Sequence, residues 1–274
     1  MRRIAHVLLR EVEYAKPASL AEALAILKGN DGARALAGGQ TLINVMKARA
    51  ASPDVLVDLA DIGELRGIEL GADGTLELGA MTTYSDIIDS AEARARPILG
   101  EVCNQIADVQ VRNRGTIGGN VCSNDPTNHL PPLLVAIGAT MTIVGTDGER
   151  SVPAEEFFLG VYMTAAGPGE LLTKISVPPG KSDGFASVPI GKDGTCIVNV
   201  AASLDGGAAR LAIGCVDAVP VLLKPESTED DAVRTAVQGA NLDPPWDVHA
   251  SADYRRHLAE VLALRAVAQA AGRT

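Results

Sequence analysis

The chain has 274 residues, of which 47% are apolar, and a formal net charge of −10 from 24 basic and 34 acidic residues. This length and apolar content predict a globular protein with one large domain or two to three smaller ones. The negative charge opposes binding to a nucleic-acid backbone, and no basic tract interleaved with aromatic residues offsets it. The composition therefore argues against nucleic acid as a partner.

The sequence also argues against a membrane span and a metal site. No run of about 18 uncharged apolar residues occurs, and the opening MRRIAHVLLREVEY meets charges too early for a secretory signal, so we expect a cytoplasmic protein. The cysteines are far apart and form no C-x-x-C pair, which predicts buried thiols rather than zinc or iron–sulfur ligands. These cysteines are Cys103, Cys122, Cys196 and Cys215.

The first elements in chain order are a helix, a strand and a short helix. Residues 19–28 predict a helix, because Ser19 and Glu22 have capping-box spacing and four apolar side chains share one face. The segment ARALAGGQTLINVMKAR at 33–49 then predicts a short strand, a glycine turn and a short helix or turn.

The middle of the chain predicts strands with helices inserted. Residues 54–60 alternate like a strand, and residues 66–80 predict a hairpin that turns at Asp73–Gly74. Helices are predicted over 83–90 and 97–107.

A second hairpin over 139–152, turning at Asp147–Gly148, and a strand over 170–177 lead to a boundary at the Pro178–Gly180 punctuation. Beyond this boundary the sequence predicts three strands joined by glycine turns, and two closing helices. The strands are 184–190, 195–204 and 208–218, the turns Asp193–Gly194 and Asp205–Gly206, and the helices about 227–239 and 251–271.

Two glycine motifs stand out, LAGGQT at 36–41 and TIGGN at 116–120. Each places a glycine pair after an apolar residue, where consecutive backbone N–H groups can point into one concavity that suits a phosphate. A lone glycine pair is more often a structural turn, but two such pairs with polar side chains beside them favour the two walls of a pyrophosphate site. The G-x-G-x-x-G and P-loop patterns are both absent, so neither standard phosphate-binding fold is indicated.

These motifs carry a resemblance to a known family. ALAGGQTLINVMKAR, RNRGTIGGNVCSNDPTN and GELLTKISVP occur in this order, and the chain from Tyr14 to its end resembles the medium, FAD-binding subunits of the molybdenum hydroxylases. That family includes the carbon monoxide dehydrogenase medium subunit and the xanthine dehydrogenase flavin domain. The resemblance implies an α+β fold, with an FAD-binding domain of the vanillyl-alcohol-oxidase (PCMH) type in two parts, 1–60 and 61–178, and a C-terminal domain of antiparallel sheet with helices, 179–274.

The resemblance also implies a set of cofactor-binding residues, with backbone N–H groups of both glycine motifs on the FAD pyrophosphate. Ile106 and Leu172 match positions that line the flavin or adenine, although an ordinary core position is the alternative for both. The residues implied are Leu36, Ala37, Gly38, Gly39, Gln40, Thr41, Leu42, Ile106, Thr116, Ile117, Gly118, Gly119, Asn120, Asp125, His129, Leu172 and Lys192.

Two departures from the family pattern concern this set. Most relatives have an aspartate where this chain has His129, and a histidine cannot replace a carboxylate acceptor one for one. The alternative for His129 is a surface residue without a role in binding. Asp125 is nearby but belongs to another place in the pattern. A basic residue usually follows soon after the aromatic that opens the C-terminal domain, here Phe185, yet the first is Lys192. Both departures imply weaker FAD binding.

The resemblance implies an electron-transfer role without a catalytic acid or base, because the flavin carries the chemistry. The implied partners are a molybdopterin-binding large subunit and a [2Fe–2S] small subunit, in a dimer of heterotrimers. A scaffold subunit with a degenerate flavin site and a free-standing flavin oxidoreductase are the alternatives. If the glycine motifs form the site, we expect Gly38→Val or Gly118→Val to lose flavin with the fold largely kept.

Overall fold

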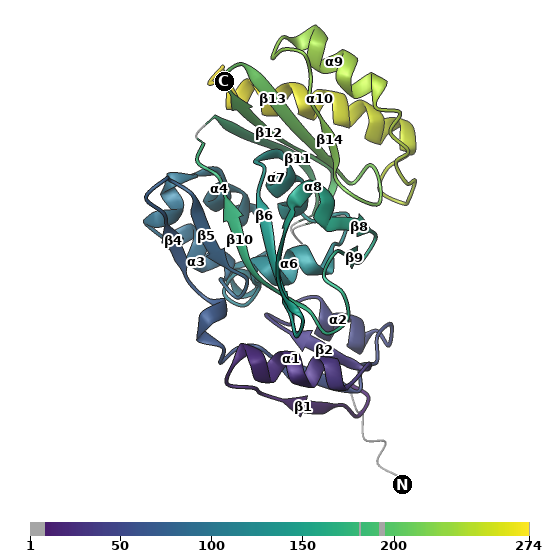
Figure 1. Cartoon of the computed structure of the whole chain (residues 1–274). Coiled ribbons are helices and arrows are strands. Elements are labelled where there is room, and N and C mark those ends of the chain that lie inside the picture. Colours follow the sequence, from purple (N-terminus) through teal and green to yellow (C-terminus); the bar gives the residue numbers. More distant parts are fainter. Residues whose placement is uncertain (1–8, 181, 192–194, 274) are drawn as a thin grey trace.

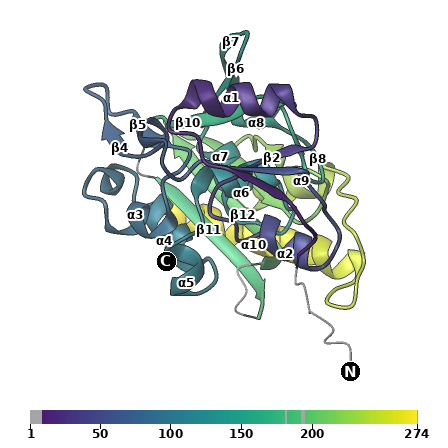
Figure 2. The ribbon, with the colours of Figure 1, turned by 90° about the horizontal axis from the view of Figure 1, so that it is seen from below.

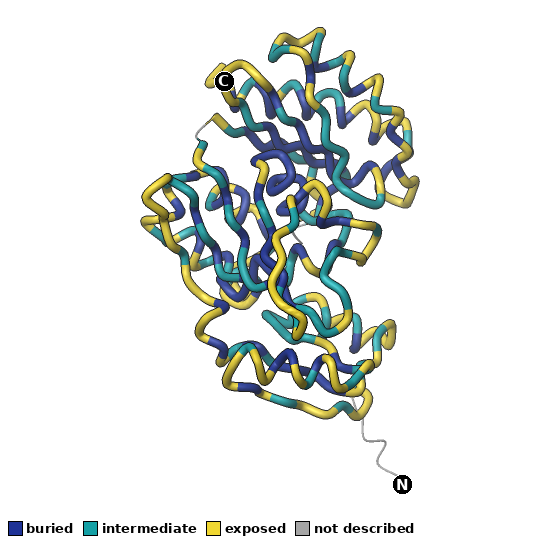
Figure 3. Tube along the Cα trace, in the orientation of Figure 1, coloured by how far each residue is buried: buried dark blue, intermediate teal, exposed yellow. Residues whose placement is uncertain are grey.

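The computed structural model describes residues 9–180, 182–191 and 195–273. The chain forms three parts in sequence order, which lie at the bottom, middle and top of Figure 1. Each part contains most of one cluster of buried apolar side chains. Figure 3 colours the buried stretches of the chain dark blue in all three parts. Helices and mostly antiparallel sheets are mixed, so the α+β expectation is confirmed.

The N-terminal part is a small parallel sheet with the strand order β1-β3-β2, and α1 packs on it. The α1 helix begins where predicted, because the Ser19 hydroxyl accepts a bond from the N–H of Glu22. The Glu22 carboxylate accepts from Ala18, one residue before the position that completes a capping box. The elements are β1 (Glu13–Ala15), α1 (Leu20–Gly29), β2 (Ala33–Leu36), α2 (Leu42–Lys47), β3 (Val55–Asp58) and the 3-10 turn η1 (Gly63–Leu65).

The central part is an antiparallel sheet of order β4-β5-β10-β6-β7, with helices that share its buried cluster. Its strands are β4 (Ile68–Leu70), β5 (Leu76–Gly79), β6 (Thr140–Gly145), β7 (Gly148–Pro153) and β10 (Leu171–Val177), and β8 (Phe158–Gly160) and β9 (Met163–Thr164) form a separate hairpin. Its helices are α3 (Tyr84–Asp89), η2 (Glu92–Ala95), α4 (Ile98–Gln105), α5 (Val109–Arg112), α6 (Ile117–Ser123), α7 (Leu130–Ala136) and α8 (Ala154–Phe157).

Both predicted hairpins are present, but the second turn is one residue earlier than expected. Gly145 pairs with Gly148, so Thr146 and Asp147 form the turn. Gly148 opens β7 with a φ of 128°, a conformation that favours glycine. The short helices α5, α6 and α7 were not predicted, because none is long enough to show a clear apolar period.

The C-terminal part is an antiparallel sheet of order β11-β12-β13-β14, covered on one face by two helices. Close packing is possible because Gly184 has no side chain: a Cβ there would lie 2.1 to 3.0 Å from the α10 backbone, nearest to the Ala266 oxygen. The elements are β11 (Asp183–Ile190), β12 (Thr195–Asp205), β13 (Ala208–Gly214), β14 (Val221–Leu223), α9 (Asp230–Gly239) and α10 (Ala252–Ala270).

The three predicted strands and two predicted helices of this part are confirmed. Asp205 pairs with Ala208, so the turn is Gly206–Gly207 rather than Asp205–Gly206. The predicted turn at Asp193–Gly194 lies outside the described residues. The described part of the chain contains no helix that is both long and apolar enough to cross a membrane.

The N-terminal and central parts touch at more than one place. The tip of the β6–β7 hairpin reaches α1, as the view from below shows (Figure 2), and the Lys28 ammonium lies 3.3 Å from the Asp147 carboxylate. Leu65, Met81 and Leu171 belong to the apolar cluster of the N-terminal part, although they come later in the chain than residue 60. The division at residues 60 and 178 therefore stays a prediction.

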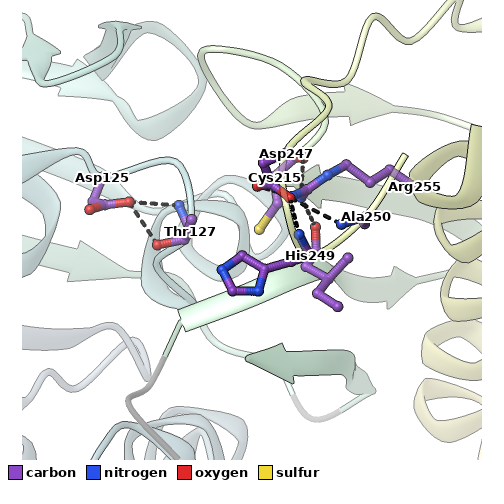
Figure 4. A network of polar contacts seen from close by, with 8 residues as sticks. Asp125, Thr127, Cys215, Asp247, His249, Ala250 and Arg255 are labelled. Carbon is purple, nitrogen blue, oxygen red and sulfur yellow. Dashed lines mark hydrogen bonds and ion pairs between the residues drawn. The ribbon is translucent and has the colours of Figure 1, made fainter. Parts of the chain in front are cut away.

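A buried arginine network fixes the loop between α9 and α10. The Arg255 guanidinium donates to the Asp247 carboxylate at 2.7 Å and to the backbone oxygens of Ile197 and Cys215, as drawn in part in Figure 4. Asp247 in turn accepts N–H bonds from His249 and Ala250. The loop is thereby attached to β12 and to the end of β13.

The central and C-terminal parts are joined by a second buried arginine. The Arg96 guanidinium makes a two-pronged ion pair with Asp183 at 2.6 and 2.7 Å, and also donates to the Pro178 carbonyl and the Ser203 hydroxyl. Both charged side chains are almost completely buried. Because water does not reach either side chain, each buried charge is stabilised by the other, and removal of one leaves the other uncompensated.

We predict that Arg96→Met lowers the free energy of unfolding by about 3–5 kcal/mol, since it leaves the Asp183 carboxylate buried without its partner. Urea unfolding followed by circular dichroism measures the change. Lys16→Met is the matched control, because it removes an ion pair to Asp61 that is largely exposed, and it should leave stability unchanged. Equal effects of the two substitutions would contradict the assigned role of Arg96.

Candidate functional site

A cavity of about 450 Å³ lies between the N-terminal and central parts. Its walls come from the β2–α2 loop, from the segment that opens α6, from the start of β10 and from the β8–β9 turn. The structure thus brings together two glycine motifs that lie about 80 residues apart in sequence. The predicted site residues that line the cavity are Ala37, Gly38, Gly39, Gln40, Thr41, Leu42, Thr116, Gly118, Gly119, Asn120 and Leu172.

Gly38 lets the first motif touch the segment before α6. A Cβ at this position would lie 2.0 Å from the backbone oxygen of Arg114, far inside contact distance. Gly39 has a φ of 73°, which side-chain-bearing residues rarely adopt. The loop can therefore lie against its neighbour only with glycines at these positions.

Gly118 makes the second close approach. Its N–H donates to the Ala80 backbone oxygen at 2.9 Å, and a Cβ would meet Ala80 at 2.6 Å. Gly115 makes a third, since a Cβ there would lie 2.6 Å from the Tyr84 ring. These glycines bring backbone close to protein, rather than holding space open for a ligand.

The second motif is the first turn of a helix, and this differs from the expected nest of free N–H groups. Thr116 caps α6, because its hydroxyl accepts from the Gly119 N–H at 3.1 Å. The N–H groups of Ile117 and Asn120 bond to the carbonyls of Thr82 and Thr116. All four N–H groups from Ile117 to Asn120 already have partners within the chain.

The first motif keeps its backbone donors free. Among the described residues, none accepts a hydrogen bond from the backbone N–H groups of Gly38, Gly39, Gln40 and Thr41. Arg34, on β2, also lines the cavity and adds a positive charge, although its guanidinium donates to the backbone oxygens of Asp31 and Ala33. Four unpaired N–H groups beside a cation form a site for an anion.

The α6 wall offers polar side chains. The Asn120 side-chain oxygen Oδ1 is buried without a hydrogen-bond partner in the described structure, which is costly unless a ligand satisfies it. The Tyr84 hydroxyl interacts with the Asn120 side chain, and burial raises the pKa of this phenol well above the usual value even though the contact with Asn120 lowers it, so it stays protonated. Cys122 also lines the cavity and is exposed, contrary to the expectation of four buried thiols, whereas Cys103, Cys196 and Cys215 are buried as predicted.

Some predicted site residues lie outside the cavity lining. Leu36 is the last residue of β2. Ile106 and Ile117 pack in the central apolar cluster. An ordinary core position was the alternative given for Ile106, and the structure places it in the core. Asp125 lies in the loop after α6, where its carboxylate accepts bonds from Thr127 and Tyr162. Lys192 lies outside the described residues.

His129 is neither at the surface nor in the cavity wall. It is 2% exposed, and its ring stacks on Phe185 with centroids 5.5 Å apart. Its Nε2 lies 3.4 Å from the Cys196 sulfur. The histidine therefore packs between the central and C-terminal parts, and the surface alternative for this residue is wrong.

Sequence reasoning missed several lining residues, among them Arg34, Leu59, Met81, Tyr84 and Tyr162. Tyr84 is the first residue of a helix that was correctly predicted. Aromatic residues make up only 3% of the chain, so each one was worth considering as a site residue, and no other feature of the sequence marked Tyr84. Tyr162 lies in a turn without any motif. Only folding brings these side chains to the glycine segments.

The comparisons with known proteins agree on one family. Residues 10–180 match the model of the FAD binding domain in molybdopterin dehydrogenase. The carbon monoxide dehydrogenase medium chain of Afipia carboxidovorans is 40% identical, covering 95% of this chain and 97% of that one. The glyceraldehyde dehydrogenase medium chain of Sulfolobus acidocaldarius is 34% identical, covering 95% and 99%.

Solved structures show the same similarity in three dimensions. A chain of carbon monoxide dehydrogenase from Hydrogenophaga pseudoflava superposes with a TM-score of 0.89 at 35% identity, covering 97% of this chain and 99% of that one. A chain of quinoline 2-oxidoreductase from Pseudomonas putida 86 gives a TM-score of 0.88 at 33% identity, covering 97% and 98%.

We predict that Gly38→Ala and Gly118→Ala each lower the free energy of unfolding by about 1–3 kcal/mol, because the new Cβ overlaps backbone of the facing segment. The larger valine side chain should cost more stability than alanine at both positions, so loss of flavin in the valine variants has to be measured together with their stability. Thermal unfolding measures the effect. Gly29→Ala is the control, since nothing lies within 4 Å of its Cβ position, and it should leave stability unchanged or slightly raised.

Proposed function

Because the chain belongs to the FAD-binding medium subunits of the molybdenum hydroxylases, we propose that it passes electrons from the [2Fe–2S] clusters of a partner through FAD to an external acceptor. The chain is thus an FAD-binding subunit of an oxidoreductase. The observation that carries the proposal is the single cavity shared by both glycine motifs, with four free N–H groups in one wall.

The residues of the cavity fit FAD. The diphosphate carries the negative charge that the free N–H groups from Gly38 to Thr41 and the Arg34 side chain attract. The cavity volume of about 450 Å³ lies within the usual range for small-molecule sites, about 300–1,000 Å³. We assign the diphosphate to the first motif.

The second motif has a different role in this proposal. Its N–H groups are occupied, so Thr116 to Asn120 contribute shape and the unpaired Asn120 oxygen, which can accept a bond from a ribityl or ribose hydroxyl. Leu172 lines the same cavity while it also packs in the central apolar cluster, and its resemblance to a flavin-lining position supports an apolar contact with the cofactor.

Bound FAD would supply the exchange between two-electron and one-electron steps that side chains cannot perform. The chain itself binds and orients the cofactor and shields part of it from water. We assign no catalytic acid or base to it.

The names of the relatives support partners. Proteins called medium chain or medium subunit belong to assemblies with other chains, and we propose a molybdopterin-binding large subunit and a [2Fe–2S] small subunit, in a dimer of heterotrimers. A cytoplasmic location is part of the proposal, supported by four cysteines that form no disulfide.

The rival proposal is a scaffold subunit with a degenerate flavin site, and the departures at His129 and Lys192 favour it. His129 lies outside the cavity lining, so its presence leaves the walls around the first motif intact. We therefore favour the flavin-binding role.

We predict that the purified chain, or the complex that contains it, carries FAD with flavin absorbance bands. Analytical extraction of the nucleotide identifies it, and the subunits that copurify show the assembly. A colourless preparation that takes up no added FAD would favour the scaffold instead.

We also predict that Asn120→Ala weakens FAD binding by about threefold to tenfold, the contribution of one hydrogen bond, and lowers the stability of the FAD-free chain only slightly, through loss of the contact to the Tyr84 hydroxyl. The reason is that this substitution removes a buried acceptor that has no partner until ligand binds. Titration with FAD and urea unfolding measure the two quantities. Asn104→Ala, an exposed asparagine on α4, is the control and should change neither.

A further inference from the structure

The β8–β9 hairpin exposes large apolar side chains at the edge of the cavity. Leu159, Val161, Tyr162 and Met163 lie within five consecutive positions and are each more than half exposed. Of these four, Tyr162 also lines the cavity. A clustered apolar surface beside a binding site indicates contact with something that is bound there.

Tyr162 occupies an unfavourable backbone conformation. Gly160 pairs with Met163, so Val161 and Tyr162 form the turn, and Tyr162 has a φ of 57°. Glycine or asparagine adopts this region at lower cost, and a large aromatic residue does so rarely. A large side chain kept at a strained turn position is an observation from which a role for that side chain can be inferred.

The turn is held from beneath by one buried side chain. Asn124 is 1% exposed, and its amide donates to the backbone oxygens of Gly160 and Met163 at 2.7 and 3.2 Å. The backbone N–H of Tyr162 donates to the backbone oxygen of Asn124 at 3.1 Å. The hairpin consequently has a fixed position relative to the end of α6.

The aromatic ring is held in turn by Asp125. The Tyr162 hydroxyl donates to Asp125 Oδ2 at 3.2 Å, while Asp125 Oδ1 accepts the N–H and hydroxyl of Thr127 at 2.9 and 2.7 Å. Figure 4 shows the two bonds between Thr127 and Asp125. The Thr127 carbonyl accepts from the Cys196 N–H, so the support reaches the C-terminal sheet.

We propose that the Tyr162 side chain covers the solvent-facing side of FAD bound in the cavity. Asp125 is the positioning residue that holds the Tyr162 ring in this place. This inference rests on the proposed function. Tyr162 is 64% exposed, so its ring is accessible to a ligand. Because the ring is already held on a fixed turn, it loses little conformational freedom on binding, and its contact with the cofactor is favourable. The position assigned to Asp125 in the cofactor set is thus explained by an indirect contact.

Tyrosine nitration with tetranitromethane tests the cover directly. The full chain, with any subunits that accompany it, is compared before and after FAD is removed, and nitrated peptides are quantified by mass spectrometry. Tyr162 should react severalfold more slowly with FAD bound. Tyr254, which is 47% exposed on α10 and outside the cavity lining, should react equally in both states.

Variants provide the second readout, the rate at which FAD leaves the protein, followed by the fluorescence of released FAD. Tyr162→Ala should raise this rate by about threefold to tenfold, the value of one aromatic contact, and Tyr254→Ala should not change it. Tyr162→Phe and Asp125→Ala should each give a smaller rise, and the two together no more than the larger one, because both break the same bond.

The outcomes separate the two claims. Equal nitration of Tyr162 with and without FAD, or an unchanged release rate in Tyr162→Ala, overturns the cover while the proposed function stands. A preparation that binds no FAD at all overturns the proposed function and the cover with it. Additive effects of Tyr162→Phe and Asp125→Ala would show that Asp125 does not act through the ring.

Discussion

The cavity depends on close contact between backbone segments that come from different parts of the chain. Gly38 lies against the Arg114 carbonyl, and Gly118 lies against Ala80, at distances where no Cβ fits. These two contacts attach the β2–α2 loop and the start of α6 to the same central scaffold. Because the contacts are between main chains, they fix the walls more rigidly than long side chains would.

From this constraint follows a division of roles between the two motifs. The α6 segment uses its N–H groups to complete a helix turn and to bond Thr82 and Ala80, so its glycines are structural. Within the described residues the N–H groups of Gly38 to Thr41 in the β2–α2 loop have no such partners, and we propose that they bind an anion. Motifs that look alike in sequence therefore differ in their hydrogen bonding, and in our proposal one acts as a support and the other binds the FAD diphosphate.

Much of the fold was readable from the sequence where local chemistry was strong. Ser19 capped its helix as expected, and the alternating arms around Asp73 formed the predicted hairpin. The hairpin turns at Thr146–Asp147 and Gly206–Gly207 were each misplaced by one residue. Gly148 follows the first turn instead of lying in it, and Asp205 precedes the second turn because it pairs with Ala208. The helices α5 to α7 were missed because they are held by tertiary contacts rather than by their own periodicity.

The site was readable only in part. The motifs identified the segments that meet, but not which of their N–H groups remain free, since this depends on distant acceptors such as Ala80 and Thr82. His129 was judged by its place in a family pattern, whereas its surroundings, Phe185 and Cys196, come from the C-terminal sheet. Tyr162 had no sequence signal at all, because its role arises from a turn held by the loop after α6.

Amide hydrogen exchange, measured residue by residue with and without FAD, tests the division of roles most directly. The account predicts that the amides of Gly38 to Thr41 exchange rapidly in the FAD-free protein and become strongly protected when FAD binds. The amides of Ile117 to Asn120 should be slow in both states, because they are already bonded. Protection that FAD induces at Ile117 to Asn120, with none at Gly38 to Thr41, would contradict it.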